Sequence, residues 1–150
     1  MNVDGTPFRT IWLADDDWAV EIIDQTKLPH EFITVRLENL GDACMAIRDM
    51  WVRGAPLIGA TAAYGMALSV HADSSDGALE AAYKALYATR PTAVNRRWAL
   101  DEMKVLLAPL SANERKEAAY RRAAEICDED VEICSSIGDN VKPLIEAAWE

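Results

Sequence analysis

Cysteine, basic charge and long apolar runs are all scarce in this sequence. The three cysteines, Cys44, Cys127 and Cys134, are an odd number without a disulfide framework, which predicts a reducing, cytoplasmic compartment. Fifteen basic against twenty-five acidic side chains give a net charge of −10, which argues against nucleic acid or anionic membranes as partners. The longest uncharged run, residues 54–70, is too short and too rich in Ala and Gly for a membrane span. The polar and acidic first residues predict no signal peptide.

What the sequence does contain fits one soluble globular domain. Its 150 residues are 51% hydrophobic and 27% charged, a composition that can bury a sizeable core. The negative net charge still allows a local basic pocket for one small anion.

The N-terminal quarter has the alternating pattern of β-strands. Residues 10–13 and 18–23 flank the acidic residues 14–17, which indicates a hairpin connection. Residues 32–37 form a third alternating segment. Strands are therefore expected at about residues 10–37.

From residue 39 onward the apolar spacing changes to that of helices. Asn39 is placed to cap a first helix, and Gly54 is expected to end it. Residues 56–70 are apolar all round, so a second helix here should be buried on most sides. The apolar face of the first helix consists of Leu40, Ala43, Cys44, Ile47, Met50 and Trp51.

Two further helices are expected in the middle of the chain. One begins within residues 73–77 and ends near Arg90 and Pro91. The next is predicted to be capped by Thr92 and to run to about Leu107.

A long final helical stretch completes the chain. It begins near Ser111, which pairs with Glu114 as a capping box, and Gly138 is expected to interrupt it before residues 142–149 resume the helix. The prediction is a single α+β domain over residues 1–150, mostly helical, with a small N-terminal antiparallel sheet followed by a helical bundle at about residues 40–149.

The segment with the clearest chemical meaning is Arg53-Gly54-Ala55, directly before Pro56. Helix N-termini carry unpaired N–H groups and about half a positive charge, so they attract phosphate. Gly54 would let the backbone approach the anion, and Arg53 could bind it with a forked, charge-assisted hydrogen bond. An ordinary helix–Gly–Pro–helix corner with a solvated arginine explains the same spacing.

A second arginine stands at another predicted helix start. Pro91 favours an extended backbone at Arg90, which then points away from the helix that follows. Arg90 could meet the same anion as Arg53, although a surface arginine beside a helix cap is the simpler interpretation of these residues alone.

Other reactive residue types form no catalytic or metal-binding pattern. Cys127 and Cys134 are seven residues apart on one helical face, without His or further Cys at metal-ligand spacing. The cysteines are therefore expected to act as small apolar side chains. His30 and His71 have no partner in a triad pattern, and the acidic runs are expected to be solvated surface.

Two linked segments resemble the methylthioribose-1-phosphate isomerase family. Residues 52–65, VRGAPLIGATAAYG, look like that family's first signature, and residues 89–95, TRPTAVN, are similar to its second. Residues 18–29, WAVEIIDQTKLP, and residues 123–126 also resemble it, in the same order. The resemblance covers nearly the whole chain.

The resemblance implies an N-terminal region of small sheet and helices, joined to a Rossmann-like catalytic domain that lies beyond these residues. It implies isomerisation of an aldose 1-phosphate to the ketose methylthioribulose-1-phosphate in methionine salvage, without metal or organic cofactor. Both an enediol and a direct hydride shift remain open. Family members are usually dimeric, through parts outside this chain, so a homodimer remains open for the full-length form.

Site residues follow from the resemblance position by position. Arg53, Gly54 and Ala55 match the first substrate-binding motif, and Arg90 matches the second. The catalytic cysteine and aspartate of the family have no counterpart in these residues, so no catalytic residue is expected here and the chain alone should be inactive.

The sequence also departs from the family pattern, and other functions remain open. Arg96 stands where a more apolar residue is usual, and residues 138–141 lack the expected His-Gly pair. The alternatives are part of a ribose-1,5-bisphosphate isomerase and a non-catalytic regulatory or assembly module, related to the regulatory subunits of the translation-initiation exchange factor.

Overall fold

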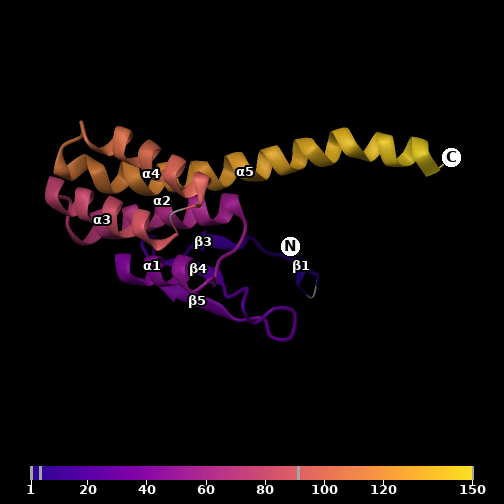
Figure 1. Cartoon of the computed structure of the whole chain (residues 1–150), viewed down its shortest axis with the longest axis horizontal. Helices are drawn as coiled ribbons and strands as arrows, with labels where there is room; N and C mark the ends of the chain where they lie inside the picture. Colours follow the sequence, from indigo (N-terminus) through magenta and orange to yellow (C-terminus); the bar gives the residue numbers. More distant parts are fainter. Residues whose placement is uncertain (1, 4, 91, 150) are drawn as a thin grey trace.

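The computed structural model describes residues 2–3, 5–90 and 92–149. Five short strands precede five helices, and Figure 1 shows the helices stacked over the small sheet. The strands are β1 (Asn2–Val3), β2 (Thr6–Pro7), β3 (Ile11–Leu13), β4 (Val20–Ile23) and β5 (Thr34–Leu37). The helices are α1 (Leu40–Arg48), α2 (Ala55–Ala72), α3 (Asp76–Thr89), α4 (Val94–Leu107) and α5 (Ala112–Trp149).

The main sheet is antiparallel with the order β3-β4-β5, which confirms the predicted fold class. In the central strand, Ile22 lies opposite Ile11 of β3 and Val35 of β5. Val20 and Ile22 are fully buried and point to the helices, as the two-residue period of a strand requires. The short β1–β2 hairpin was not expected from the sequence.

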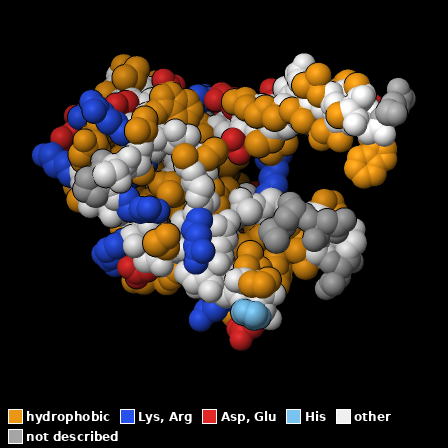
Figure 2. Space-filling model, turned by 45° about the vertical axis from the view of Figure 1, so that its right-hand side comes forward, with side chains coloured by type: hydrophobic (Ala, Val, Ile, Leu, Met, Phe, Trp, Pro, Cys, Tyr) orange, Lys and Arg blue, Asp and Glu red, His pale blue; other side chains and the backbone are white. Residues whose placement is uncertain are grey.

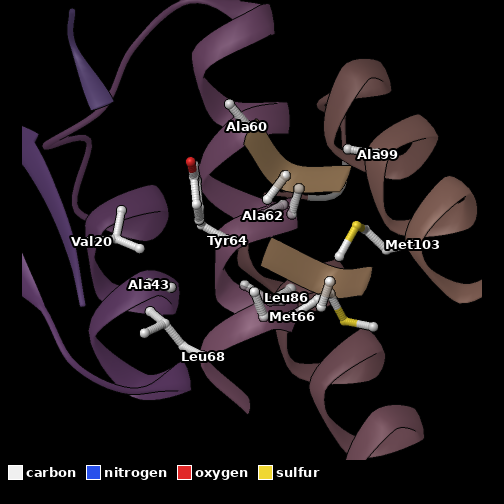
Figure 3. Packing of buried hydrophobic residues seen from close by; sticks show 14 of the residues in the cluster. Val20, Ala43, Ala60, Ala62, Tyr64, Met66, Leu68, Leu86, Ala99 and Met103 are labelled. Carbon is white, nitrogen blue, oxygen red and sulfur yellow. The ribbon is translucent and has the colours of Figure 1, made fainter. Parts of the chain in front are cut away.

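Helix α2 is the centre of the domain, and its residues from Ile58 to Leu68 are all buried. It contacts the other four helices and strand β3, which explains why its sequence is apolar on every side. Its buried hydroxyl, on Thr61, donates to the carbonyl oxygen of Leu57 at 2.7 Å. Figure 3 shows side chains of α2, such as Ala62 and Met66, among those of the neighbouring helices.

The small residues of α2 permit close helix packing. A Cβ added at Gly65 would lie 2.9 Å from Leu86 Cδ2 on α3 and 3.0 Å from Ala43 Cβ on α1. Two helices therefore meet α2 at the level of this one residue.

Three helices begin with a side chain that caps their backbone. The Asn39 side chain accepts a hydrogen bond from Asp42 N at the start of α1, as predicted. The Ser75 hydroxyl accepts one from Ala78 N at the start of α3. Before α5, the Glu114 carboxylate accepts a hydrogen bond from Ser111 N at 3.1 Å. This bond is one of the two that make up the predicted capping box.

Arg115 joins four helix termini at one end of the bundle, here called the closed end. This buried guanidinium donates to the carbonyl oxygens of Leu107 (2.9 Å), Ala108 (3.2 Å) and Ser74 (2.8 Å), and it pairs with the Asp76 carboxylate. The end of α4, the segment after α2, and the starts of α3 and α5 are thereby held together. The closed end is defined by Ser74, Asp76, Leu107, Ala108 and Arg115.

Two sequence predictions about helix ends are wrong. Helix α1 ends at Arg48, and Met50 has a left-handed backbone (φ 62°), so Gly54 does not terminate this helix but precedes the next one. Gly138 does not interrupt the last helix. Helix α5 continues through Gly138 and Pro143 to Trp149.

The second half of α5 projects beyond the body of the domain (Figure 1). Every residue from 131 to 149 is exposed, and Figure 2 shows hydrophobic side chains along this arm. Among the described residues, no helix is both long and apolar enough to cross a membrane. The exposed apolar face of the arm is defined by Ile133, Ile137, Val141, Leu144, Ile145 and Trp149.

Candidate functional site: two uncapped helix starts

The first predicted anion site lies at the start of α2. Gly54 is the residue that precedes the helix, with φ 89°, a backbone conformation that a side chain would strain. None of the described side chains caps this helix start, so the N–H groups of Ala55 and Leu57 remain available as hydrogen-bond donors. The exposed Arg53 is held through its backbone, because its N–H donates to Gln25 Oε1 at 3.0 Å.

The second predicted segment lies at the start of α4. The residue that precedes this helix is Ala93, whose side chain makes no hydrogen bond to the helix. The prediction that Thr92 caps α4 is therefore wrong. The half-buried Arg90 is extended (φ −147°, ψ 89°), and its carbonyl oxygen accepts a hydrogen bond from Ala93 N at 3.1 Å. Pro91 lies outside the described residues.

The two helix starts are neighbours in the structure. A Cβ added at Gly59, in the second turn of α2, would lie only 3.1 Å from the backbone oxygen of Asn95 in the first turn of α4. Pro56 and Asn95 line the same cleft, of about 100 Å³. We call this region the open end of the bundle and define it by Arg53, Gly54, Arg90, Ala93 and Asn95.

The arginine side chains of the open end have no partners in the described part of the chain. Neither the Arg53 nor the Arg90 side chain makes a hydrogen bond or ion pair with the residues that the structure describes. Elsewhere, arginines such as Arg36, Arg115 and Arg122 are paired with carboxylates. Two unpaired cations therefore precede two uncapped helix starts.

Helix α5 adds carboxylates to the other side of the cleft. Glu129 is paired with Arg122, whose Nη1 lies 2.6 Å from Glu129 Oε1. Asp130 is half-buried, lines the cleft beside Pro56, and has no hydrogen-bond or salt-bridge partner among the described residues. Asp130 therefore opposes a bound anion electrostatically, whereas Glu129 is largely neutralised.

Arg96, one residue beyond Asn95, is a feature that sequence reasoning noted only as a departure. Its side chain is fully buried, and its Nε, Nη1 and Nη2 atoms lack hydrogen-bond partners within the described part of the chain. The guanidinium lies over the Tyr87 ring, with Cζ 4.8 Å from the ring centroid. Burial lowers the pKa of Arg96 below its usual value.

The cysteines show no sign of catalytic activation. Burial raises the pKa of the Cys127 thiol to about 11, and burial also raises the pKa of Cys44. Both thiols are therefore protonated at neutral pH and are poor nucleophiles. Within the described residues, no group of three or more His, Cys, Asp or Glu side chains could hold a metal ion.

Comparison with known proteins gives the class of the chain. The model of the Initiation factor 2 subunit family matches residues 51–148, a range that includes both arginine segments. The chain belongs to this family, and its fold is found in two solved members.

The relatives make the assignment more specific. Over 98% of its length, the chain is 62% identical to the methylthioribose-1-phosphate isomerase of Paramagnetospirillum magneticum. The 5-methylthioribose 1-phosphate isomerase structure from Pyrococcus horikoshii matches 83% of the chain, with 38% identity and a TM-score of 0.75. The structure of translation initiation factor eIF-2B subunit delta from A. fulgidus matches 84%, with 34% identity and a TM-score of 0.76.

These matches confirm the family resemblance seen in the two sequence motifs. They also set its extent, because the chain spans only 41% of the Paramagnetospirillum relative and 37% and 38% of the two solved chains.

Proposed function

We propose that the chain is the N-terminal part of a methylthioribose-1-phosphate isomerase and binds the phosphate group of the sugar at its open end. The observation that carries this proposal is the pairing of two adjacent, uncapped helix starts with Arg53 and Arg90, which have no partner among the described residues. Gly54 and Ala55 complete the set of proposed substrate-binding residues.

The physical basis is the match between a phosphate dianion and the groups of the open end. Each helix start offers free N–H donors and about half a positive charge. The forked guanidinium groups of Arg53 and Arg90 can each donate two hydrogen bonds to phosphate oxygens. A side chain at position 54 would strain the backbone conformation that opens α2 to an anion.

In this proposal the chemical step belongs to residues outside this chain. The buried Cys127 thiol is protonated, and the isomerase of Paramagnetospirillum magneticum is more than twice as long as the chain. The exposed apolar face of α5, from Ile133 to Trp149, supports packing against a further domain, because such surfaces are rare on isolated soluble domains. The proposed whole enzyme converts the aldose phosphate to its ketose in methionine salvage.

A non-catalytic regulatory or assembly module is the second candidate. It is favoured by the likeness to the eIF-2B delta subunit at 34% identity, together with the same exposed face of α5. A ribose-1,5-bisphosphate isomerase is the alternative within the enzyme class, since it would use the same phosphate-binding groups.

The test is calorimetric titration of the 150-residue chain with methylthioribose-1-phosphate. We expect saturable binding that weakens about tenfold in Arg53→Ala and in Arg90→Ala, because each change removes charge-assisted hydrogen bonds. Arg121→Ala is the matched control, since Arg121 is exposed on α5 and pairs with Glu117, one turn away on the same helix.

Turnover assays distinguish the candidates further. The chain alone should form no methylthioribulose-1-phosphate, and detectable turnover would contradict the assignment of catalysis to other residues. Equal binding by all four proteins, or binding by none, would contradict the phosphate-site proposal and favour the assembly module.

A further inference from the structure

Arg96 is the most unusual polar side chain in the domain. A guanidinium without hydrogen bonds is unfavourable in a buried site, because it loses hydration without gaining acceptors. All three of its nitrogen atoms lack hydrogen-bond partners among the described residues, and the guanidinium lies against the face of the Tyr87 ring. The buried arginine Arg115 shows the usual solution, with acceptors for each of its nitrogen atoms.

Among the described residues, no carboxylate lies within hydrogen-bond distance of the Arg96 guanidinium. Arg96 lies in the first turn of α4, whose N–H groups are not capped by a side chain. Arg90, at the end of α3, is close enough for its charge to act on Arg96. Two cations and a helix start therefore lie at the corner between α3 and α4, and this arrangement favours an anion electrostatically.

Tyr87 forms the cover of this corner. It lies in the last turns of α3, its side chain is 37% exposed, and its ring stacks on Tyr83 at 6.0 Å between centroids. The ring covers the Arg96 guanidinium and is itself partly exposed, so an outward rotation of this one side chain, away from Tyr83 and Arg96, is the movement that would uncover the guanidinium.

We propose that Arg96 forms a second oxyanion subsite at the α3–α4 corner, which binds a phosphate or sulfate group when the Tyr87 ring turns outward. This subsite is separate from the start of α2 and depends on Arg96 and the uncapped first turn of α4. The subsite extends the proposed function from a ligand with one anionic group to a ligand with two. It does not require that Arg53 binds phosphate.

The experiment measures binding of inorganic phosphate by calorimetry and by the rise in Tm, with sodium chloride at equal ionic strength as reference. Arg96→Leu removes the guanidinium and leaves an apolar side chain, and Arg96→Met is a second variant should leucine pack poorly. Arg97→Leu is the matched control, because it removes the same charge from the neighbouring, exposed position that faces Asp101.

We expect Arg96→Leu to raise Tm without phosphate, because a buried unpaired charge is removed. We also expect the affinity of Arg96→Leu for phosphate at this subsite to fall about tenfold. Arg97→Leu should change the phosphate affinity less than about twofold. Unchanged phosphate binding in both Arg96 variants would overturn the subsite.

Arg53→Ala separates this proposal from the previous one. Phosphate binding that survives Arg53→Ala but is lost in Arg96→Leu supports the subsite and contradicts the α2 site. Binding that is lost entirely in Arg53→Ala, with Arg96 intact, overturns the subsite and leaves the α2 site standing.

Discussion

The two ends of the helical bundle differ in how the unpaired backbone groups of their helix termini and the nearby arginines are satisfied. At the closed end, Arg115 donates to the last carbonyl groups of α4 and to the segment after α2, while Ser75 and Glu114 satisfy the starts of α3 and α5. At the open end, α2 and α4 begin without a capping side chain, and the arginines beside them are unpaired in the described structure.

The difference shows where the domain has hydrogen-bond donors that its own fold does not use. A missing cap leaves a helix less stable by about 1 kcal/mol, and unpaired arginines add nothing to the stability of the fold. Stability is therefore concentrated at the closed end, and the open end keeps donors free for a ligand. This arrangement is typical of binding sites supported by a rigid scaffold.

The largest expected effect is the loss of the closed end. Arg115→Ala removes the guanidinium that donates to the carbonyl oxygens of Ser74, Leu107 and Ala108, so the free energy of unfolding should fall by about 3 kcal/mol. Urea unfolding followed by circular dichroism measures this change. Arg121→Ala, on the exposed side of α5, should change it by less than about 0.5 kcal/mol. Similar values for the two variants would contradict the role of Arg115.

Close packing between α2 and α4 should matter next. Gly59→Ala places a methyl group 3.1 Å from the backbone oxygen of Asn95, which must move, so we expect a loss of about 1–2 kcal/mol and weaker phosphate binding. Gly138→Ala is the control, since nothing lies within 4 Å of its added Cβ. Unfolding and titration of both variants check the prediction. Unaltered binding in Gly59→Ala would show that the spacing of the two helix starts is unimportant.

A capping side chain introduced at the start of α4 should stabilise this helix and compete with a bound anion. Ala93 has an extended backbone (φ −79°, ψ 98°) suited to a capping residue, so Ala93→Asp should stabilise the domain by about 1 kcal/mol. The same carboxylate should weaken phosphate binding severalfold, because it occupies the helix start. At the capped start of α3, Ser75→Ala should instead lose about 1 kcal/mol. Stronger phosphate binding in Ala93→Asp would contradict an anion site at α4.

Removal of an opposing charge should improve binding. Asp130→Asn takes away the unpaired carboxylate beside Pro56, so phosphate affinity should rise about threefold at low salt and less at high salt. Glu129→Gln is the comparison, because Glu129 is already paired with Arg122 and should have a smaller effect. Titration at two ionic strengths separates this electrostatic gain from a change in shape.

The smallest expected effect is a pH dependence near the closed end. Burial, followed by the charge of Lys116, lowers the pKa of His71 below 6.5, and its ring stacks on Trp18 at 5.0 Å. The unfolded chain therefore binds the proton more readily, so stability is complete above pH 6.5 and is lost as the pH falls through that value. Urea unfolding at pH 8 and pH 5.5 should show this loss in the natural sequence and a smaller one in His71→Phe. Equal pH dependence in both would exclude His71 as the cause.

Much of the fold could be predicted because local patterns and tertiary packing agree. The alternation around Ile11, Val20 and Leu37 gave the sheet, and the uniformly apolar sequence of α2 predicted its central position. Gly138 was misleading because glycine disfavours a helix interior only moderately, by about 1 kcal/mol relative to alanine, in a long helix that is otherwise regular.

The position of the candidate site follows only in part from the sequence. The sequence indicated Arg53, Gly54 and Arg90, but it could not show that α2 and α4 start side by side, because that depends on the packing at Gly59. It suggested Thr92 as a cap by residue type, whereas helix α4 begins one residue later. The burial of Arg96 had only one signal, a charged residue where apolar ones are usual.

The central claim is that the open end is the part of this domain that binds phosphate. Amide NMR spectra recorded during titration with inorganic phosphate at constant ionic strength test it most directly. The account predicts saturable shifts for the amides of Ala55, Leu57 and Val94, and none for those of Asp42 and Ala78, which are already bonded to Asn39 and Ser75. Shifts confined to the capped helix starts, or no saturable shift at α2 and α4, would contradict it.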